Sequence, residues 1–307
     1  MIRSVAVLGA GAVGAYLIWG LAERKDIDFC VVAEGERKER FEREGFCINQ
    51  KVYFPKVKTP EEAKGVDLLV VSLKYNSLRP ALGSIQTIVD EHTIVMSLMN
   101  GVDSEEIIGE VIYQENILYS YVKIASERKE NRTVFDPETT VGIIYGEIDE
   151  ARGTERTAAV DALFEGTGIH YRTANYILGE IWGKFRLNIC NNLAQAFLGV
   201  GVGAYQDSEH AAFFQEKLGE EVDNIAKAKG LDVEFIRNCG KGSVVKKRAR
   251  YSTLQDLDAK RHTEIDMFSG TVMRIGKELG IPTPYNTFTY HTIKALEEKN
   301  DGLFDYE

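Results

Sequence analysis

The sequence predicts an α/β domain of the Rossmann type over residues 1–175, followed by an all-helical domain over residues 176–307. Three observations support this prediction. The first half alternates short apolar runs with segments of helical periodicity, which is the pattern of a parallel sheet flanked by helices. A glycine-rich turn joins the first apolar run to the first helical segment. Beyond residue 176 long helical segments dominate, and little of the chain there is typical of a strand.

Four apolar runs in the first half are the predicted strands, because a parallel strand that is covered on both faces is apolar throughout. Small and apolar residues at helical spacing follow the first run, so a helix is expected over Ala12–Leu21. The four runs are Val5–Leu8, Phe29–Ala33, Asp67–Leu73 and Thr93–Met99.

The second half contains four segments with helical periodicity. The third is expected to be unbroken and to stop at Pro282 and Pro284, because proline cannot continue a helix. The four helices are expected over Tyr176–Phe197, Ala211–Lys229, Asp256–Leu279 and Thr287–Lys299.

Composition excludes several classes of protein. With 47 acidic and 37 basic residues, the net charge of −10 gives no electrostatic footprint for nucleic acid. No run approaches the roughly 18 uncharged apolar residues of a membrane span, and no secretory signal is recognisable. The histidines and cysteines show no metal-ligand spacing, so no metal is expected. The four cysteines are expected to be buried reduced thiols in a cytoplasmic protein: Cys30, Cys47, Cys190 and Cys239.

The glycine-rich turn has the spacing G-x-G-x-x-G between a strand pattern and a helix pattern. Gly9 allows the tight turn, Gly11 lets a pyrophosphate approach the backbone, and Gly14 lets the helix pack close to the strand. The N-terminus of the helix then faces the phosphates with its partial positive charge. A glycine-rich turn in an unrelated α/β protein is the alternative. The residues expected to contact a dinucleotide are Gly9, Ala10, Gly11, Ala12, Val13 and Gly14.

Glu34 follows the second strand, about 20 residues after the glycine motif. A carboxylate there can accept hydrogen bonds from both ribose hydroxyls of NADH and would repel the 2′-phosphate of NADPH. Arg37 and Lys38 lie a few residues downstream and could reach such a phosphate. The choice between NADH and NADPH therefore stays open, as does the alternative that Glu34 is a solvated loop carboxylate.

In the helical half, Lys184, Asn188 and Asn192 are spaced at i, i+4 and i+8 within a largely apolar segment, so they share one helix face. A lysine and two amides that are buried together need a polar partner, and a small anionic substrate would satisfy all three. A solvated polar stripe is the alternative.

Two other polar segments have simpler interpretations on their own. Ser252 followed by Gln255 fits a capping box, and Glu264 then lies among ordinary helix-surface carboxylates. The basic run Lys246–Arg250 could attract an anion, although a solvated helix face is the simpler interpretation.

Taken together, these segments resemble the ketopantoate reductase (2-dehydropantoate 2-reductase) family over nearly the whole length. The correspondence runs in chain order. It comprises the G-x-G-x-x-G turn, Lys74 after the third strand, Asn100-Gly101 after the fourth, the Lys-x3-Asn-x3-Asn helix, Ser252-x-Leu-Gln-Asp, the run Arg261–Asp266 and the closing Gly280–Asn286.

The resemblance implies a role for each matching residue. Lys184 corresponds to the proton donor, and Glu264 to the acidic residue that helps to hold this lysine and the substrate. Asn188, Asn192 and Ser252 correspond to substrate-binding positions. Asn100 corresponds to an asparagine near the nicotinamide and the substrate, and Lys74 to a lysine that contacts the cofactor. NADPH is the cofactor of most of the family, and ketopantoate, a 2-oxo acid, is the substrate.

The chain departs from the family pattern at three places. Glu34 stands where most members carry an arginine, which favours NADH. Leu193-Ala194-Gln195 replaces the usual Pro-Leu-Thr/Ser, which leaves room for another 2-oxo acid as substrate. Ser77 takes a position that usually holds Asp or Gln.

Two rival functions remain at this level. One is a related 2-hydroxy-acid dehydrogenase, and the other is a non-catalytic NAD(P)-binding redox sensor. A sensor has no need of a proton donor, so the presence of both Lys184 and Glu264 disfavours it. A helical second domain with an apolar surface could also support a homodimer.

Overall fold

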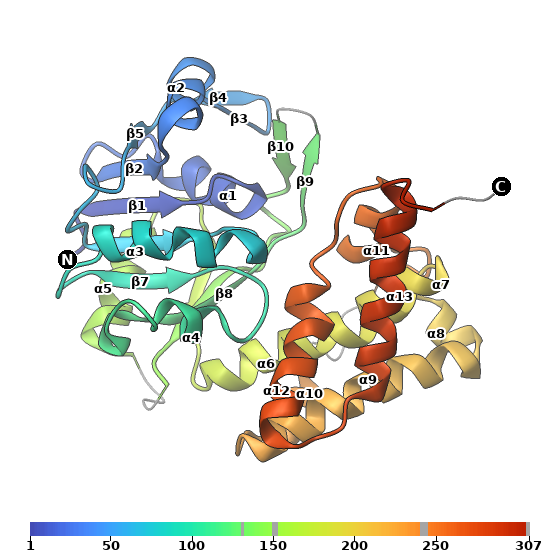
Figure 1. Cartoon of the computed structure of the whole chain (residues 1–307). Helices are drawn as coiled ribbons and strands as arrows, with labels where there is room; N and C mark the ends of the chain where they lie inside the picture. Colours follow the sequence, from blue (N-terminus) through green and yellow to red (C-terminus); the bar gives the residue numbers. More distant parts are fainter. Residues whose placement is uncertain (130–131, 149–152, 240–244, 305–307) are drawn as a thin grey trace. The chain divides into compact units, whose positions relative to one another are not determined.

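A computed structural model describes residues 1–129, 132–148, 153–239 and 245–304 of the chain (Figure 1). It forms two compact units, Met1–Ile177 and Leu178–Glu307. The predicted fold class is confirmed: the first unit contains a parallel sheet flanked by helices, and the second is helical. Among the described residues, no helix is long and apolar enough to cross a membrane.

A five-stranded parallel sheet forms the centre of the first unit. Four of its strands are the predicted apolar runs. The fifth, β5, was not predicted, because three residues of the sequence Lys-Val-Lys give no apolar run. The strand order is β5 (Lys56–Lys58), β2 (Asp28–Val32), β1 (Ser4–Leu8), β6 (Leu68–Val71) and β7 (Ile94–Ser97). Along the chain, β2 and β5 are added on one side of β1, and β6 and β7 then follow on its other side.

Both faces of this sheet are covered, which explains why its four predicted strands are largely apolar. Val5 and Val7 pack into one buried cluster together with Tyr16 of α1. Alternate residues of the same strand, such as Ala6, pack into a second cluster with Ile85 of α3. The helices of the unit are α1 (Ala12–Leu21), α2 (Gly35–Glu44), α3 (Leu82–Ile88), α4 (Ser104–Ile108) and α5 (Glu155–Phe164).

Two smaller sheets complete the unit, and the sequence did not predict them. Most of their strands have only three to five residues, too few to show a clear period. One sheet joins β4 (Lys51–Tyr53), β3 (Phe46–Ile48), β10 (Arg132–Phe135) and β9 (Ser126–Lys129); the other joins β12 (Tyr171–Thr173), β11 (Gly142–Gly146) and β8 (Tyr119–Lys123).

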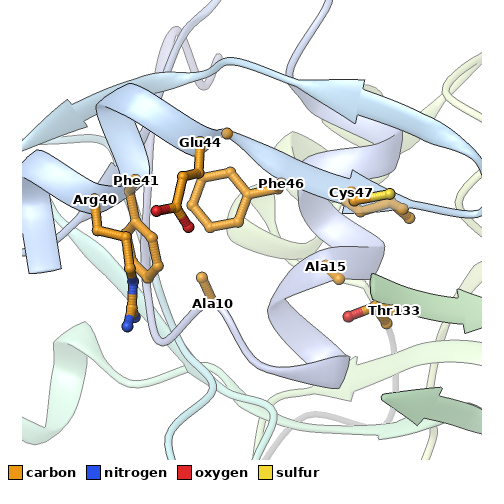
Figure 2. Close-up of a pocket in the computed structure, with 10 residues that line it drawn as sticks. Ala10, Ala15, Arg40, Phe41, Glu44, Phe46, Cys47 and Thr133 are labelled. Atoms are coloured by element: carbon orange, nitrogen blue, oxygen red, sulfur yellow. The ribbon is translucent and has the colours of Figure 1, made fainter. Parts of the chain in front are cut away.

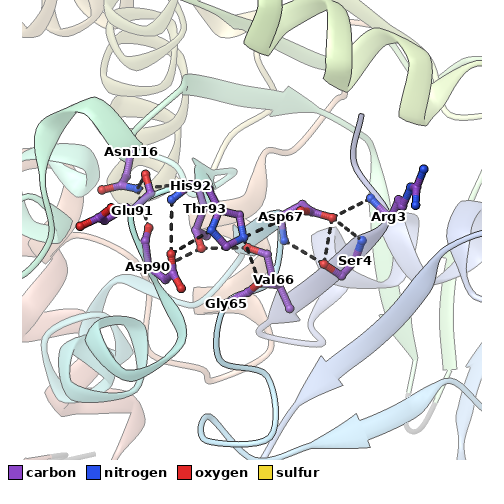
Figure 3. Close-up of polar contacts among 10 residues, drawn as sticks. All are labelled: Arg3, Ser4, Gly65, Val66, Asp67, Asp90, Glu91, His92, Thr93 and Asn116. Atoms are coloured by element: carbon purple, nitrogen blue, oxygen red, sulfur yellow. Dashed lines mark hydrogen bonds and ion pairs between the residues drawn. The ribbon is translucent and has the colours of Figure 1, made fainter.

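Polar side chains fasten the amino ends of the parallel strands (Figure 3). The Asp67 carboxylate accepts hydrogen bonds from the backbone N–H groups of Arg3 and Ser4 at 2.7 and 2.9 Å, and from the Ser4 hydroxyl at 3.0 Å. The Thr93 hydroxyl donates to the carbonyl of Val66 at 2.8 Å. This end of the sheet is therefore fixed, and the predicted cofactor residues follow the strands at the opposite end.

The second unit contains helices and no strand among its described residues. Two of the helical segments are single π-helical turns. The elements are α6 (Ile177–Asn188), a π-turn (Ile189–Leu193), α7 (Ala194–Leu198), α8 (Ala204–Asp207), α9 (Glu209–Ala228), α10 (Val233–Asn238), α11 (Ser252–Asp258), a π-turn (Asp266–Gly270), α12 (Thr271–Leu279) and α13 (Pro284–Asn300).

Two of the helix predictions need correction. The helix expected to run unbroken from Asp256 to Leu279 is interrupted: α11 ends at Asp258, and Lys260 adopts a left-handed φ of 51°. The last helix begins at Pro284 rather than Thr287, because proline lacks only an N–H that the first helical turn does not use. Pro284 thus starts a helix instead of stopping one, and Gly280, with φ 68°, ends α12.

Candidate functional site

The carboxyl ends of four parallel strands meet at one edge of the large sheet. Leu8 of β1 pairs in register with Val32 of β2 and with Val71 of β6, and Val71 pairs with Ser97 of β7. The order of the strands reverses between β1 and β6, and ligands of open α/β sheets bind outside the strand ends at such a point. The predicted cofactor residues leave the sheet at this edge: Gly9–Gly14, Glu34, Lys74 and Asn100.

The three glycines of the first turn face different surroundings. A Cβ on Gly9, which has φ +109°, would lie 2.5 Å from the carbonyl oxygen of Ser72. A Cβ on Gly14 would lie 2.1 Å from the carbonyl oxygen of Gly9. A Cβ on Gly11 would meet nothing within 4 Å. The fold thus requires glycine at two positions, whereas at Gly11 the missing side chain leaves room beside the backbone.

The N-terminus of α1 lies at the same turn. Gly11 is its N-cap residue, no side chain caps the helix, and the first turn contains no acidic residue. The partial positive charge of a ten-residue helix is therefore available to an anion. Together with the room beside Gly11, this arrangement fits the pyrophosphate of a dinucleotide.

Glu34 lies just beyond β2, in the N-cap position of α2, where its exposed side chain does not cap the helix. The two basic residues considered as phosphate ligands have other contacts. The Lys38 ammonium pairs with the Glu62 carboxylate at 2.6 Å. The Arg37 guanidinium lies 5.3 Å from the ring centroid of Phe41. Glu34 is thus the charged group nearest in sequence to the end of β2.

A pocket under α2 lies close to the glycine turn (Figure 2). Of the predicted site residues, Ala10 alone is among those that line it, so this pocket is not the predicted dinucleotide site. The lining residues are Ala10, Ala15, Arg40, Phe41, Glu44, Gly45, Phe46, Cys47, Ile48 and Thr133.

Lys74 and Asn100 occupy the turns after β6 and β7. Lys74 is exposed and precedes a single 3₁₀ turn, Tyr75–Ser77, that includes the departure at Ser77. Asn100 is half-buried and is followed by Gly101, whose φ of +102° is one that glycine tolerates and other residues avoid.

Sequence reasoning missed a group of buried acids just after Asn100. The Tyr75 hydroxyl donates to the Asp103 carboxylate at 2.8 Å, and the Ser104 hydroxyl donates to the Glu105 carboxylate at 2.7 Å. Burial raises the pKa of Glu105 to about 7. The signal was present in the sequence, because Asp-Ser-Glu directly follows a buried strand and its turn.

In the second unit, Lys184 and Asn188 are half-buried on α6, and Asn192 is 6% exposed in the following π-turn. An α-helix turns about 100° per residue, so a residue at i+8 lies about 80° around the helix from residue i. A π-turn holds more residues per turn and rotates less per residue. The π-turn therefore brings Asn192 closer to the line of Lys184 and Asn188 than a regular helix would.

A buried ion-pair cluster fixes α6 against its neighbours. Asp223 of α9 is 3% exposed and accepts two hydrogen bonds from the Arg186 guanidinium, at 2.6 and 3.1 Å. Arg237 of α10 donates to the same carboxylate at 2.7 Å. Arg186 lies between Lys184 and Asn188 in sequence, so this cluster sets the position of the segment that carries both.

Ser252 is the exposed first residue of α11, and the predicted capping box is wrong. Tyr251 holds the N-cap position, and no side chain caps the helix. The Gln255 amide donates instead to the carbonyl of Arg250 at 2.7 Å.

Gln195 holds the chain just before Ser252. Its fully buried amide donates to the carbonyl of Ala249 at 2.9 Å and accepts the N–H of Tyr251 at 2.6 Å. The sequence marked Gln195 as a departure from the family pattern but gave no indication of these contacts.

Glu264 is half-buried and lies in the irregular segment between α11 and the second π-turn, so it is not the helix-surface carboxylate expected from periodicity. The basic run is exposed and forms turns rather than a helix. Lys247 pairs with Asp207 and Arg250 with Asp258, both at 2.6 Å. No group of three His, Cys, Asp or Glu residues that could hold a metal occurs in the part of the chain that the structure describes.

Comparisons with known proteins agree with the motifs. The family model "Ketopantoate reductase PanE/ApbA" matches residues 5–149, and the model of the corresponding C-terminal region matches residues 176–297. A 2-dehydropantoate 2-reductase of Pyrococcus horikoshii is 27% identical over 96% of this chain and 98% of its own. A PanE/ApbA family ketopantoate reductase structure from Ralstonia eutropha has a TM-score of 0.80 at 25% identity, covering 97% of this chain and all of that one.

The same architecture occurs in a dehydrogenase of a different name. A D-mandelate dehydrogenase structure with NADH and anilino(oxo)acetate has a TM-score of 0.79 at 22% identity, covering 97% of this chain and 99% of that one. At this identity the likeness concerns the fold alone.

Proposed function

This chain belongs to the ketopantoate reductase family, nicotinamide-dependent oxidoreductases that act on a CH–OH group, and from that premise we propose that it reduces ketopantoate to pantoate. One observation carries the proposal: a half-buried lysine and two amides, Lys184, Asn188 and Asn192, follow one another along a single helix face. These side chains suit a small 2-oxo acid, which combines a carboxylate with a carbonyl that must accept a proton.

We assign binding of the dinucleotide to residues 1–175. The turn Gly9–Gly14 and the N-terminus of α1 would hold the pyrophosphate, Glu34 the ribose hydroxyls, and Lys74 and Asn100 further parts of the cofactor. When bound, NAD(P)H supplies the hydride that reduces C2 of the substrate.

We assign substrate binding and proton donation to residues 176–307. As C2 is reduced, the carbonyl oxygen gains negative charge, which the Lys184 ammonium stabilises and then neutralises by donating a proton from Nζ. A carboxylate at Glu264 would favour the charged ammonium form of Lys184, which is the form that can donate a proton. Asn188, Asn192 and Ser252 would bind the carboxylate and hydroxyl of the substrate. One hydride and one proton convert the 2-oxo acid to the 2-hydroxy acid.

Among the two cofactors we propose that NADH is preferred. Glu34 would repel the 2′-phosphate of NADPH, and the Lys38 ammonium, which could have offset this repulsion, is paired with Glu62. Lys74, exposed at the same sheet edge, and Arg37, exposed in the first turn of α2, are the other basic candidates for a phosphate that we consider.

The deciding experiment compares initial rates of ketopantoate reduction with NADH and with NADPH under matched conditions. We expect NADH to give the higher kcat/KM, and Glu34→Gln to raise the relative kcat/KM for NADPH about tenfold. Glu36→Gln, the same change two residues along in the exposed first turn of α2, should leave the ratio within about twofold. A wild-type preference for NADPH would contradict the role given to Glu34.

A related 2-oxo acid is the second candidate substrate, and Gln195 is the observation that favours it. The family pattern differs here, and the Gln195 amide fixes the backbone next to Ser252. Rates on a panel of ketopantoate, 2-oxoisovalerate and benzoylformate would decide between the two. Tight binding of NAD(P)H without turnover of any 2-oxo acid would favour the redox sensor instead.

A homodimer and a cytoplasmic location stay predictions. Phe213 and Phe288 of the second unit are 43% and 58% exposed, so both rings would be available to a subunit interface. Light scattering on the purified protein would give the oligomeric state.

A further inference from the structure

The segment that carries Glu264 is fastened on its N-terminal side by a buried carboxylate. Glu297 of α13 is 2% exposed, and its Oε1 accepts hydrogen bonds from both the backbone N–H and the hydroxyl of Thr263, each at 2.7 Å. A buried acid is costly unless its charge is compensated, so this pair of donors fixes Thr263 firmly. Thr263 is the residue directly before Glu264.

The same segment is fastened on its C-terminal side. The Asp266 carboxylate, two residues after Glu264, accepts a hydrogen bond from the Tyr290 hydroxyl at 2.8 Å and one from the Lys294 ammonium at 2.8 Å. The Lys294 ammonium also reaches the second oxygen of Glu297 at 3.3 Å. Lys294 thereby contacts both carboxylates that hold the segment, Asp266 and Glu297.

The three α13 residues in these contacts occupy one face of that helix. Tyr290, Lys294 and Glu297 are four and three residues apart, which is the spacing of neighbours along a helix surface. A single helix face therefore holds the chain on both sides of Glu264. This stretch lies between α11 and the second π-turn, and its backbone joins the following turn at Glu264, whose carbonyl accepts the N–H of Phe268 at 3.0 Å.

We propose that Glu297, bridged by Lys294 to Asp266, is a positioning residue that sets the placement of Glu264 and, through it, the proton donor. This inference rests on the proposed function, because the role of Glu264 belongs to that proposal. Glu297 touches no reacting atom. A site group must be held to within about 0.5 Å to act, and an irregular segment achieves this only if its neighbours are fixed.

The first test separates positioning from simple support of the fold. We expect Glu297→Gln to lower kcat at least tenfold, while the Kd for the dinucleotide changes less than twofold. Glu298→Gln makes the same chemical change one residue along α13 on an exposed side chain and should leave kcat within twofold. Thr263→Val should lower kcat and Thr263→Ser should retain it, because serine keeps the hydroxyl donor. A lower melting temperature with kcat within twofold in both Glu297→Gln and Thr263→Val would overturn the inference.

A second measurement needs no substrate. Hydrogen exchange in the peptide that contains Thr263, Glu264 and Ile265 should be faster in Glu297→Gln than in Glu298→Gln, because the Thr263 N–H loses its charged acceptor. Equal exchange in the two variants would overturn the inference. An inactive wild-type enzyme on every 2-oxo acid would instead contradict the proposed function, and the exchange result would still decide the placement of the segment.

Discussion

The two units fix their candidate site residues by different means. In the first unit these residues lie on turns after parallel strands, and the backbone sets their positions: register aligns the strand ends, and Gly9 and Gly14 leave no room for a Cβ. In the second unit they lie on or between helices, and buried carboxylates of distant elements hold those helices. Asp223 and Glu297 are two examples.

A third buried carboxylate shows that this is general in the second unit. Glu221 of α9 is 5% exposed and accepts the backbone N–H groups of Tyr285 and Asn286 at 2.8 and 2.9 Å, at the start of α13. Three charged groups thus join segments that are far apart in sequence. We therefore expect charge-changing substitutions to destabilise the second unit more than the first. Substitutions that add a Cβ should destabilise the first unit most when they fall in its glycine turn.

The largest expected effect is on chemistry and is confined to the second unit. Lys184→Ala should lower kcat by about 10²–10⁴-fold, because the oxygen at C2 loses its proton donor. Dinucleotide affinity, measured by fluorescence titration, should stay within about twofold. A kcat close to that of the wild type would show that Lys184 is not the proton donor. A loss of dinucleotide affinity together with kcat would show that the second unit also takes part in binding the dinucleotide.

The next largest effect is on stability. Asp223→Ala removes the buried partner of Arg186 and should lower the free energy of unfolding by about 3–5 kcal/mol, measured by urea denaturation. Asp258→Ala removes the exposed partner of Arg250 and should cost at most about 1 kcal/mol. Equal costs for the two variants would show that burial does not decide how much an ion pair stabilises the second unit.

Two glycine substitutions sharpen the comparison within the first unit. Gly14→Ala should destabilise the fold by about 3 kcal/mol, because its Cβ would lie 2.1 Å from a carbonyl oxygen. Gly11→Ala should change the melting temperature little, since nothing lies within 4 Å of its Cβ, yet weaken NADH binding at least tenfold. Unchanged NADH affinity in Gly11→Ala would contradict the placement of the pyrophosphate.

The smallest effect concerns a carboxylate of the first unit. Burial would raise the pKa of Asp67, but the N–H groups of Arg3 and Ser4 and the Ser4 hydroxyl outweigh it, so the pKa is lowered overall. A lowered pKa adds stability above the ordinary value near 4, and this stability is lost as the pH falls through the folded-state pKa. Asp67→Asn should therefore cost about 1–2 kcal/mol at pH 7 and progressively less below pH 4, as measured by denaturation at each pH. A cost that does not change with pH would contradict this account.

The same contrast explains what could be predicted from the sequence. The four apolar strands of the large sheet, the first helix and the glycine turn depend on residues adjacent in the chain, so periodicity and spacing were sufficient. The interruption after Asp258 could not be predicted, because the contact between Thr263 and Glu297 spans 34 residues. β5 was missed because an edge strand of three residues gives too short a pattern.

The candidate site divides in the same way. The sequence supplied the residues that we propose for the chemistry, because Lys184 and Glu264 belong to recognisable motifs. The residues that support them, such as Asp223 and Gln195, have no local signature, since what matters is the partner brought to them by folding. The buried Glu105 falls between these cases, because an acid directly after a strand and its turn is visible in the sequence but its burial is not.

The π-turn at Ile189–Leu193 lets the second unit hold an extra residue without a change of register beyond it. The turn contains one residue more than an α-helical path would need. Deleting a single residue there would restore α-helical pitch and leave the chain beyond close to its present rotation relative to Lys184. Gln195 would then still face Ala249 and Tyr251. Deleting a single residue from the regular part of α6 would instead rotate everything beyond by about 100° and alter the register of all the contacts that follow.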